Sequence, residues 1–173
     1  MNKIFLSAIM LIICVCSQAQ VKKIHGYVQY INAGTRQVDN ILKSQAGEEN
    51  MITSGTARYF LFLEIKSGKT VSIEAVWIKG SQFNFKTDTI KQLPFVLKSS
   101  NGGEIVFVDT LVRSAEGNII RLTGLVKTDN DVIPANIKRK IAENDVLIIF
   151  KCRKKLHSKA ILQLRTLNPI FAQ

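Results

Sequence analysis

The stretch ARYFLFLEI, residues 57–65, decides the fold of this chain because it is apolar on both faces of an extended strand. Side chains alternate between the two faces of a strand. One face carries Ala57, Tyr59, Leu61, Leu63 and Ile65. Phe60 and Phe62 lie on the other face. A strand with two apolar faces is predicted to lie in the centre of a sheet, covered from both sides.

Two glycine turns follow this strand and predict its neighbours. The turn Ser-Gly-Lys at 67–69 leads into an alternating run at 71–77, and the turn Lys-Gly-Ser at 79–81 leads into Phe83 and Phe85. Tight turns between alternating runs are typical of β-hairpins. The three strands are therefore predicted to form an antiparallel meander.

The same alternation recurs along most of the chain and sets the fold class. A first strand is predicted at 24–30, further strands at 104–112 (EIVFVDTLV) and 119–127 (IIRLTGLVK), and a closing hairpin from Asp145 onward. About eight short strands with glycine turns and no βαβ pattern predict an all-β fold. An antiparallel β-sandwich of the immunoglobulin-like type is favoured, with a small β-barrel as the alternative.

One short helix interrupts the strand pattern. Ile133, Ile137 and Ile141 recur at helical spacing, and Pro134 suits the start of a helix. No interdomain linker or internal repeat breaks the sequence, and about 150 residues are enough for one hydrophobic core. Residues 20–173 are therefore predicted to form a single β domain.

The first 19 residues have the pattern of a secretory signal peptide. Lys3 gives a positive start, residues 4–15 form an apolar run, and Ser17 and Ala19 are small residues suited to a cleavage site. The apolar run is shorter than the roughly 20 residues that a membrane-spanning helix needs. We therefore expect residues 1–19 to be removed, leaving no transmembrane span and an exported chain, either periplasmic or extracellular.

A lipid anchor at Cys14 or Cys16 is the weaker alternative, since the large residues Ile13 and Val15 precede these cysteines. After cleavage, Cys152 would be the only thiol. Strand alternation places it on the same face as Phe150, so it is predicted to be buried and structural. A zinc site would need four ligands, and His157, predicted in the hairpin turn at 155–158, is the only other candidate nearby.

Positive charge is concentrated near the C-terminus. The formal net charge of the whole chain is +11, and nine basic residues against two acidic ones lie between Lys138 and Arg165. A surface of one charge sign concentrates polyanions, although it can also serve solubility alone. Lys151, Arg153, Lys159 and Arg165 are predicted to lie on the solvent face of the last hairpin. The candidate contact residues, expected to form one electrostatic surface, are Lys151, Arg153, Lys154, Lys159 and Arg165.

The expected partners follow from this charge and from the predicted export. They are an anionic glycan, lipopolysaccharide or an acidic protein. Export argues against nucleic acid as a partner. The sequence therefore favours a non-enzymatic binding or structural domain.

No catalytic motif or metal-binding motif stands out. The chain has two histidines and no Gly-x-Ser-x-Gly stretch. Asp129-Asn130-Asp131 resembles the start of a calcium loop, but Pro134 occupies the position of the required glycine. The pair Glu48-Glu49 is expected to be solvated. No cofactor, metal or catalytic residue is predicted, and a hydrolase without a recognisable motif remains an alternative.

The aromatic residues open a further alternative, a carrier with an aromatic pocket for a small apolar ligand. Core packing is favoured over a pocket, because bulky side chains on neighbouring strands are usually buried against each other. The residues concerned are Tyr59, Phe60, Phe62, Trp77, Phe83 and Phe85.

Four stretches resemble small secreted β proteins of Bacteroidota, a group with no assigned function. They are AQ at 19–20, IEAVWIKG at 73–80, DVLIIFKCRKK at 145–155 and LNPIFAQ at 167–173. The resemblance implies export and a β fold, and it implies no activity or site.

Overall fold

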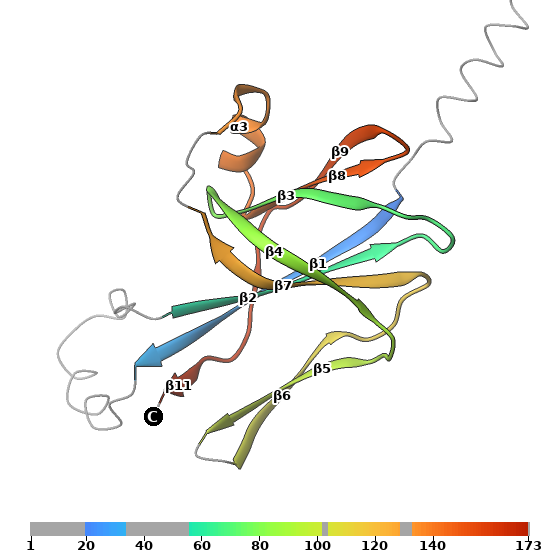
Figure 1. The fold of residues 1–173 in the computed structure, drawn as a ribbon. Coiled ribbons are helices and arrows are strands. Elements are labelled where there is room, and N and C mark those ends of the chain that lie inside the picture. Colours follow the sequence, from blue (N-terminus) through green and yellow to red (C-terminus); the bar gives the residue numbers. More distant parts are fainter. Residues whose placement is uncertain (1–19, 34–55, 102–103, 129–132, 173) are drawn as a thin grey trace, which may run out of the picture.

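The computed structural model describes residues 20–33, 56–101, 104–128 and 133–172 (Figure 1). The predicted signal peptide, residues 34–55 (which include Glu48-Glu49) and the Asp129–Asp131 motif lie outside the described residues. The elements are β1 (Val21–Ala33), β2 (Thr56–Ile65), β3 (Ser72–Ile78), β4 (Ser81–Ile90), β5 (Phe95–Asn101), β6 (Glu104–Val112), β7 (Asn118–Lys127), α3 (Ala135–Ala142), β8 (Val146–Cys152), β9 (Lys155–Ile161), β10 (Arg165–Thr166) and β11 (Ile170–Ala172).

The all-β class with one short helix is confirmed. Strands of the main sheet follow the order β10-β1-β2-β7-β4-β3-β8-β9, β11 also pairs with β1, and β5 and β6 form a separate two-stranded sheet. The main sheet curls into a half-barrel, so its architecture lies between the sandwich and the barrel (Figure 1). It is a mixed sheet, because β10 and β11 run parallel to β1, where only antiparallel pairing was expected.

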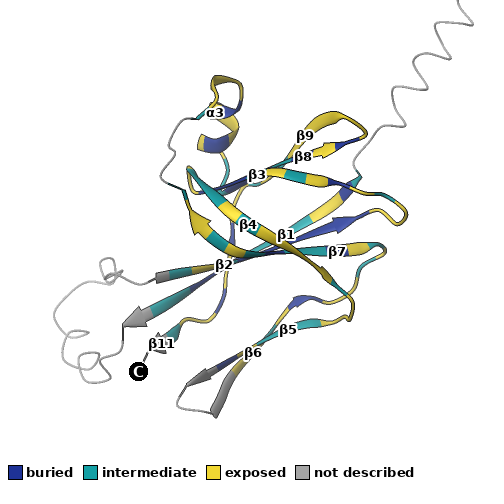
Figure 2. Ribbon diagram, in the orientation of Figure 1, coloured by how far each residue is buried: buried dark blue, intermediate teal, exposed yellow. Residues whose placement is uncertain are grey.

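Strand β2 is central, as its sequence predicts. It pairs with β1 on one side and with β7 on the other. Leu61 and Leu63 are fully buried inside the curl, and Phe62 is fully buried on the outer face. Figure 2 colours the second half of β2 as buried. Each such side chain contributes about 1.5–3 kcal/mol by leaving water. Two separate hydrophobic cores therefore meet at this one strand.

The predicted meander of β2, β3 and β4 is wrong. Only β3 and β4 form a hairpin, with Lys79 and Gly80 at positive φ in its turn. The turn after Ile65 instead carries the chain across the curl, so that β3 pairs with β8 on the opposite wall. Leu63 of β2 and Val76 of β3 then share the inner core. Two strands that face each other across a core cover each other's apolar side chains. Two strands that lie side by side in one sheet cover less of this apolar surface.

The second core covers the outer face of β2. Strand β6 pairs with β5, which the alternation had not indicated, and the hairpin packs on Phe60 and Phe62 through Phe95, Leu111 and Val112. Strand β7 separates from β6 and enters the main sheet between β2 and β4. The hairpin β5–β6 thus acts as a cover for aromatic side chains that would otherwise face solvent.

The predicted helix is confirmed as α3. It begins after Pro134, and Ile137 and Ile141 are buried against Trp77 and Leu147 on the outer face of β3 and β8. Figure 1 shows α3 and the hairpin β5–β6 at opposite ends of the curled sheet. Each covers a part of the outer sheet surface that is apolar.

The curl brings β9 against β1 at Gly26. A Cβ atom at this position would lie 2.5 Å from Cδ1 of Ile161 and 2.8 Å from Cδ2 of Leu164. Glycine therefore allows these two side-chain ends to pack close to the β1 backbone, and any larger residue would have to displace them.

Cys152 is buried at the end of β8, with 5% of its surface exposed, and its thiol donates a hydrogen bond to Oε1 of Gln20. In a chain without residues 1–19, a thiol reagent should label Cys152 about a hundredfold or more slowly in the folded protein than in denaturant, because labelling requires local opening. The rate can be followed with a chromogenic disulfide reagent. Equal rates in the folded and denatured protein would contradict a structural role.

Candidate functional site

The last hairpin turns earlier than expected. Cys152 pairs with Lys155, so Arg153 and Lys154 form a two-residue turn with φ angles of 44° and 68°. The predicted turn at 155–158 is wrong, because β9 continues through it. His157 consequently lies on β9, where it is exposed and stacks on the ring of Phe150 at 5.7 Å. A two-residue turn in which both φ angles are positive matches the right-handed twist of the flanking strands. This match explains why the chain turns at Arg153-Lys154 and not at residues 155–158.

Four basic residues lie at or beside this turn, with Lys151 and Lys155 on opposite faces of the hairpin. We call Lys151, Arg153, Lys154 and Lys155 the basic tip. All four residues are exposed, and the β8–β9 hairpin forms one edge of the main sheet (Figure 1). Among the described residues, the ion pairs are Lys22–Glu116 and Arg139–Glu143, and neither involves the basic tip.

The expectation that Lys151, Arg153, Lys159 and Arg165 share one solvent face is wrong. Lys159 pairs with the buried Ile148 and therefore lies on the inner face, whereas Lys151 pairs with Leu156 on the outer face. The ammonium of Lys159 donates hydrogen bonds to the carbonyl oxygens of Val21 and Lys22. Burial lowers the pKa of Lys159, and the charge of Glu64 opposes this shift. Lys159 therefore joins β9 to β1.

Arg165 lies apart from the basic tip. It pairs with Tyr27 on β1, whereas the end of β8 contacts Gln20. Seven residues of extended strand separate these two points, which corresponds to about 23 Å. Of the five predicted contact residues, the structure thus brings together Lys151, Arg153 and Lys154.

The sequence-based set omitted two basic residues. Lys155 belongs to the basic tip. A prediction that placed a two-residue turn at Arg153-Lys154 would have included Lys155 in the candidate set. Lys140 of α3 lies beside the hairpin, since its ammonium donates a hydrogen bond to the Ser158 hydroxyl at 2.9 Å. Leu156, paired with Lys151, adds an exposed apolar side chain next to these charges.

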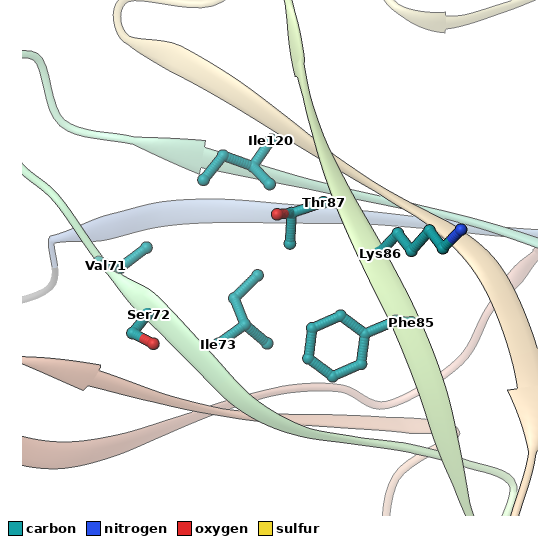
Figure 3. A pocket seen from close by; sticks show the side chains of 7 residues that line it. All are labelled: Val71, Ser72, Ile73, Phe85, Lys86, Thr87 and Ile120. Atoms are coloured by element: carbon teal, nitrogen blue, oxygen red, sulfur yellow. The ribbon is translucent and has the colours of Figure 1, made fainter.

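A second candidate site is a cavity of about 350 Å³ between β3 and β4, the β3–β4 cavity. It forms because β4 leaves β3 after Phe83 and continues along β7. Figure 3 shows the side chains of Ile73, Phe85 and Ile120 turned toward the opening, and the ammonium of Lys86 directed away. The lining is therefore mixed, because Ser72 and Thr87 add polar groups beside these apolar side chains.

The other aromatic candidates belong to the cores. Phe60, Phe62 and Trp77 are buried, and Tyr59 packs edge-on against Phe83 at 5.7 Å. Phe85 is the member of the predicted aromatic set that lines the β3–β4 cavity.

Neither histidine lies in a catalytic arrangement within the described part of the chain. Nε2 of His25 is buried there without a hydrogen-bond partner, and His157 is exposed on β9. Three or more metal-ligating side chains do not gather anywhere in the described ranges. No helix among the described residues is long and apolar enough to cross a membrane.

Comparison with known proteins gives no relative: no protein family, curated protein or solved structure matches the chain.

His25 should make the free energy of unfolding depend on pH. Burial lowers the pKa of its imidazole from 6.5, the charge of Lys23 lowers it further, and Glu64 opposes the shift. The unfolded chain therefore binds a proton more tightly, and the free energy of unfolding should fall as pH decreases below about 6.5. Urea unfolding between about pH 7.5 and 5.5, where carboxylates stay ionised, measures this slope. The slope should be smaller in His25→Gln. An identical slope in both proteins would show that His25 does not cause it.

Proposed function

We propose that this chain is an exported, non-enzymatic binding domain, periplasmic or extracellular, that contacts polyanions through the basic tip. The observation that carries the proposal is the set of four exposed basic side chains at the turn of the edge hairpin β8–β9, none of which has an acidic partner in the described part of the chain. Positive charges that lie close together without acidic partners raise the local concentration of anions. The candidate partners that carry the matching negative charge are an anionic glycan, lipopolysaccharide and an acidic protein.

The surroundings of the basic tip strengthen the charge. Lys140 approaches from α3, and Glu143 at the end of that helix is paired with Arg139. Exposed Leu156 supplies an apolar contact beside Lys151. This mixture suits lipopolysaccharide, in which phosphates adjoin acyl chains, as well as the uronates of an acidic glycan.

A small apolar ligand is the second candidate, and the β3–β4 cavity favours it. Its volume lies at the lower end of the range of small-molecule sites, roughly 300–1,000 Å³. Its apolar residues come from three different strands. A carrier function through this cavity would not involve the basic tip.

Charge reversal tests the polyanion proposal. Lys151→Glu combined with Arg153→Glu should weaken binding to lipopolysaccharide or polygalacturonate at least about 30-fold at low salt, because each basic side chain near an anionic surface contributes about 1 kcal/mol. Binding by the unchanged protein should fall steeply as salt rises, since exposed charges are screened within about 8 Å at physiological ionic strength. Calorimetric titration measures both effects.

The matched control reverses two exposed lysines elsewhere, Lys66→Glu with Lys91→Glu, which changes the net charge equally. It should retain most of the affinity. Equal losses in both double variants would attribute binding to net charge alone, and no binding by the unchanged protein at low salt would leave the basic tip a solubility feature.

Native mass spectrometry tests the carrier alternative. A retained apolar ligand should add a discrete mass to the purified protein, and Ile73→Trp should remove it by filling the β3–β4 cavity. A Ser72→Ala control should keep the added mass. Absence of any added mass after incubation with fatty acids would count against a carrier.

A further inference from the structure

A polar cleft lies between strand β6 and strand β10, well away from the basic tip, and we call it the β6–β10 cleft. It has a volume of about 460 Å³. Tyr27 forms part of its floor, Asp109, Thr110 and Arg113 line one wall, and the segment from Arg165 to Asn168 lines the other. The cleft exists because the hairpin β5–β6 packs on the outer face of β1 and β2, while β10 pairs along the edge of β1.

Hydrogen bonds from side chains of β1 hold both walls of the cleft in place. The Tyr27 hydroxyl donates to the carbonyl oxygen of Leu111, which ties β1 to β6. The amide Nε2 of the buried Gln29 donates to Ser99 Oγ at 2.9 Å and to the Asn168 carbonyl oxygen at 3.0 Å. Both walls are therefore anchored to the same strand, and the geometry of the cleft is set before any ligand arrives.

Two arginines supply positive charge. Arg113 and Arg165 line the cleft from different elements, and neither forms an ion pair with a described residue. The charge of Arg165 lowers the pKa of Tyr27 against the larger rise caused by burial, which places this charge near the floor. A guanidinium stays protonated and matches the planar fork of a carboxylate or the oxygens of a phosphate.

Asp109 adds a second requirement for a ligand, a hydrogen-bond donor. Its Oδ2 is buried and has no hydrogen-bond partner within the described part of the chain. An ionised carboxylate only accepts hydrogen bonds, so a buried oxygen of this kind calls for a donor. A ligand that satisfies all three side chains carries an anionic group and, beside it, a hydroxyl.

We propose that the β6–β10 cleft binds an acidic sugar, with its carboxylate or phosphate between Arg113 and Arg165 and a hydroxyl donating to Oδ2 of Asp109. The polar lining, which includes Thr110 and Thr166, favours such a hydroxyl-rich ligand over an apolar one. This site goes beyond the polyanion contact at the basic tip, because it selects a single sugar unit by shape and hydrogen bonding.

Titration calorimetry with defined probes tests the cleft. Trigalacturonate represents the carboxylate source and glucose 6-phosphate the phosphate source, while galactotriose is the neutral control and should not bind. Arg113→Gln and Arg165→Gln should each weaken the bound acidic sugar about tenfold or more, since each removes a charge-assisted hydrogen bond. Lys91→Gln, at an exposed residue outside both the cleft and the basic tip, should leave this binding unchanged. The tip is tested separately with the long polyanions, so failure of the cleft and failure of the tip give different results.

Asp109→Asn separates sugar recognition from simple anion binding. It should weaken the acidic sugar but not sulfate, which has no hydroxyl to donate and is repelled by the carboxylate. Binding of either acidic sugar with these losses supports the proposal and identifies the source. The proposal is overturned if neither acidic sugar binds at millimolar concentration, if both arginine variants bind like the unchanged protein, or if sulfate competes equally well.

Discussion

Burial of β2 on both faces is the constraint on which the rest of the structure depends. Leu61 and Leu63 need a wall opposite them, and the curl of the sheet provides it with β3 and β8. Phe60 and Phe62 need a cover outside, and the hairpin β5–β6 provides it. A single flat sheet would leave one of these faces in water, so the half-barrel with an added small sheet follows from one strand.

The candidate binding surfaces lie where this core ends. After Cys152 there is nothing further for β8 to cover, and the chain turns through Arg153 and Lys154 in solvent. The β6–β10 cleft arises for a related reason, because the covering hairpin and β10 both attach to β1 but do not pair with each other. The apolar core thus determines where the polar side chains are left free to bind a ligand.

Much of the fold could be predicted from local pattern, as the double-sided strand β2, the turn at Lys79-Gly80 and the helix after Pro134 show. Strand pairing could not, because alternation fixes which side chains share a face but not which strand lies alongside. Strands β10 and β11 are too short to show a period. The cleft residues Asp109, Arg113 and Arg165 meet only through that long-range pairing, so no spacing in the sequence signals the cleft. The inward direction of Lys159 follows from its pairing with Ile148.

The central claim is that this core leaves uncovered basic side chains that bind anionic glycans. The most direct measurement is an NMR titration of the ¹⁵N-labelled protein with an acidic oligosaccharide at low salt, which maps every affected backbone amide at once. The account predicts shifts concentrated at residues 151–155 and around the β6–β10 cleft. Shifts confined to the β3–β4 cavity, or no shifts at saturating ligand, would contradict it.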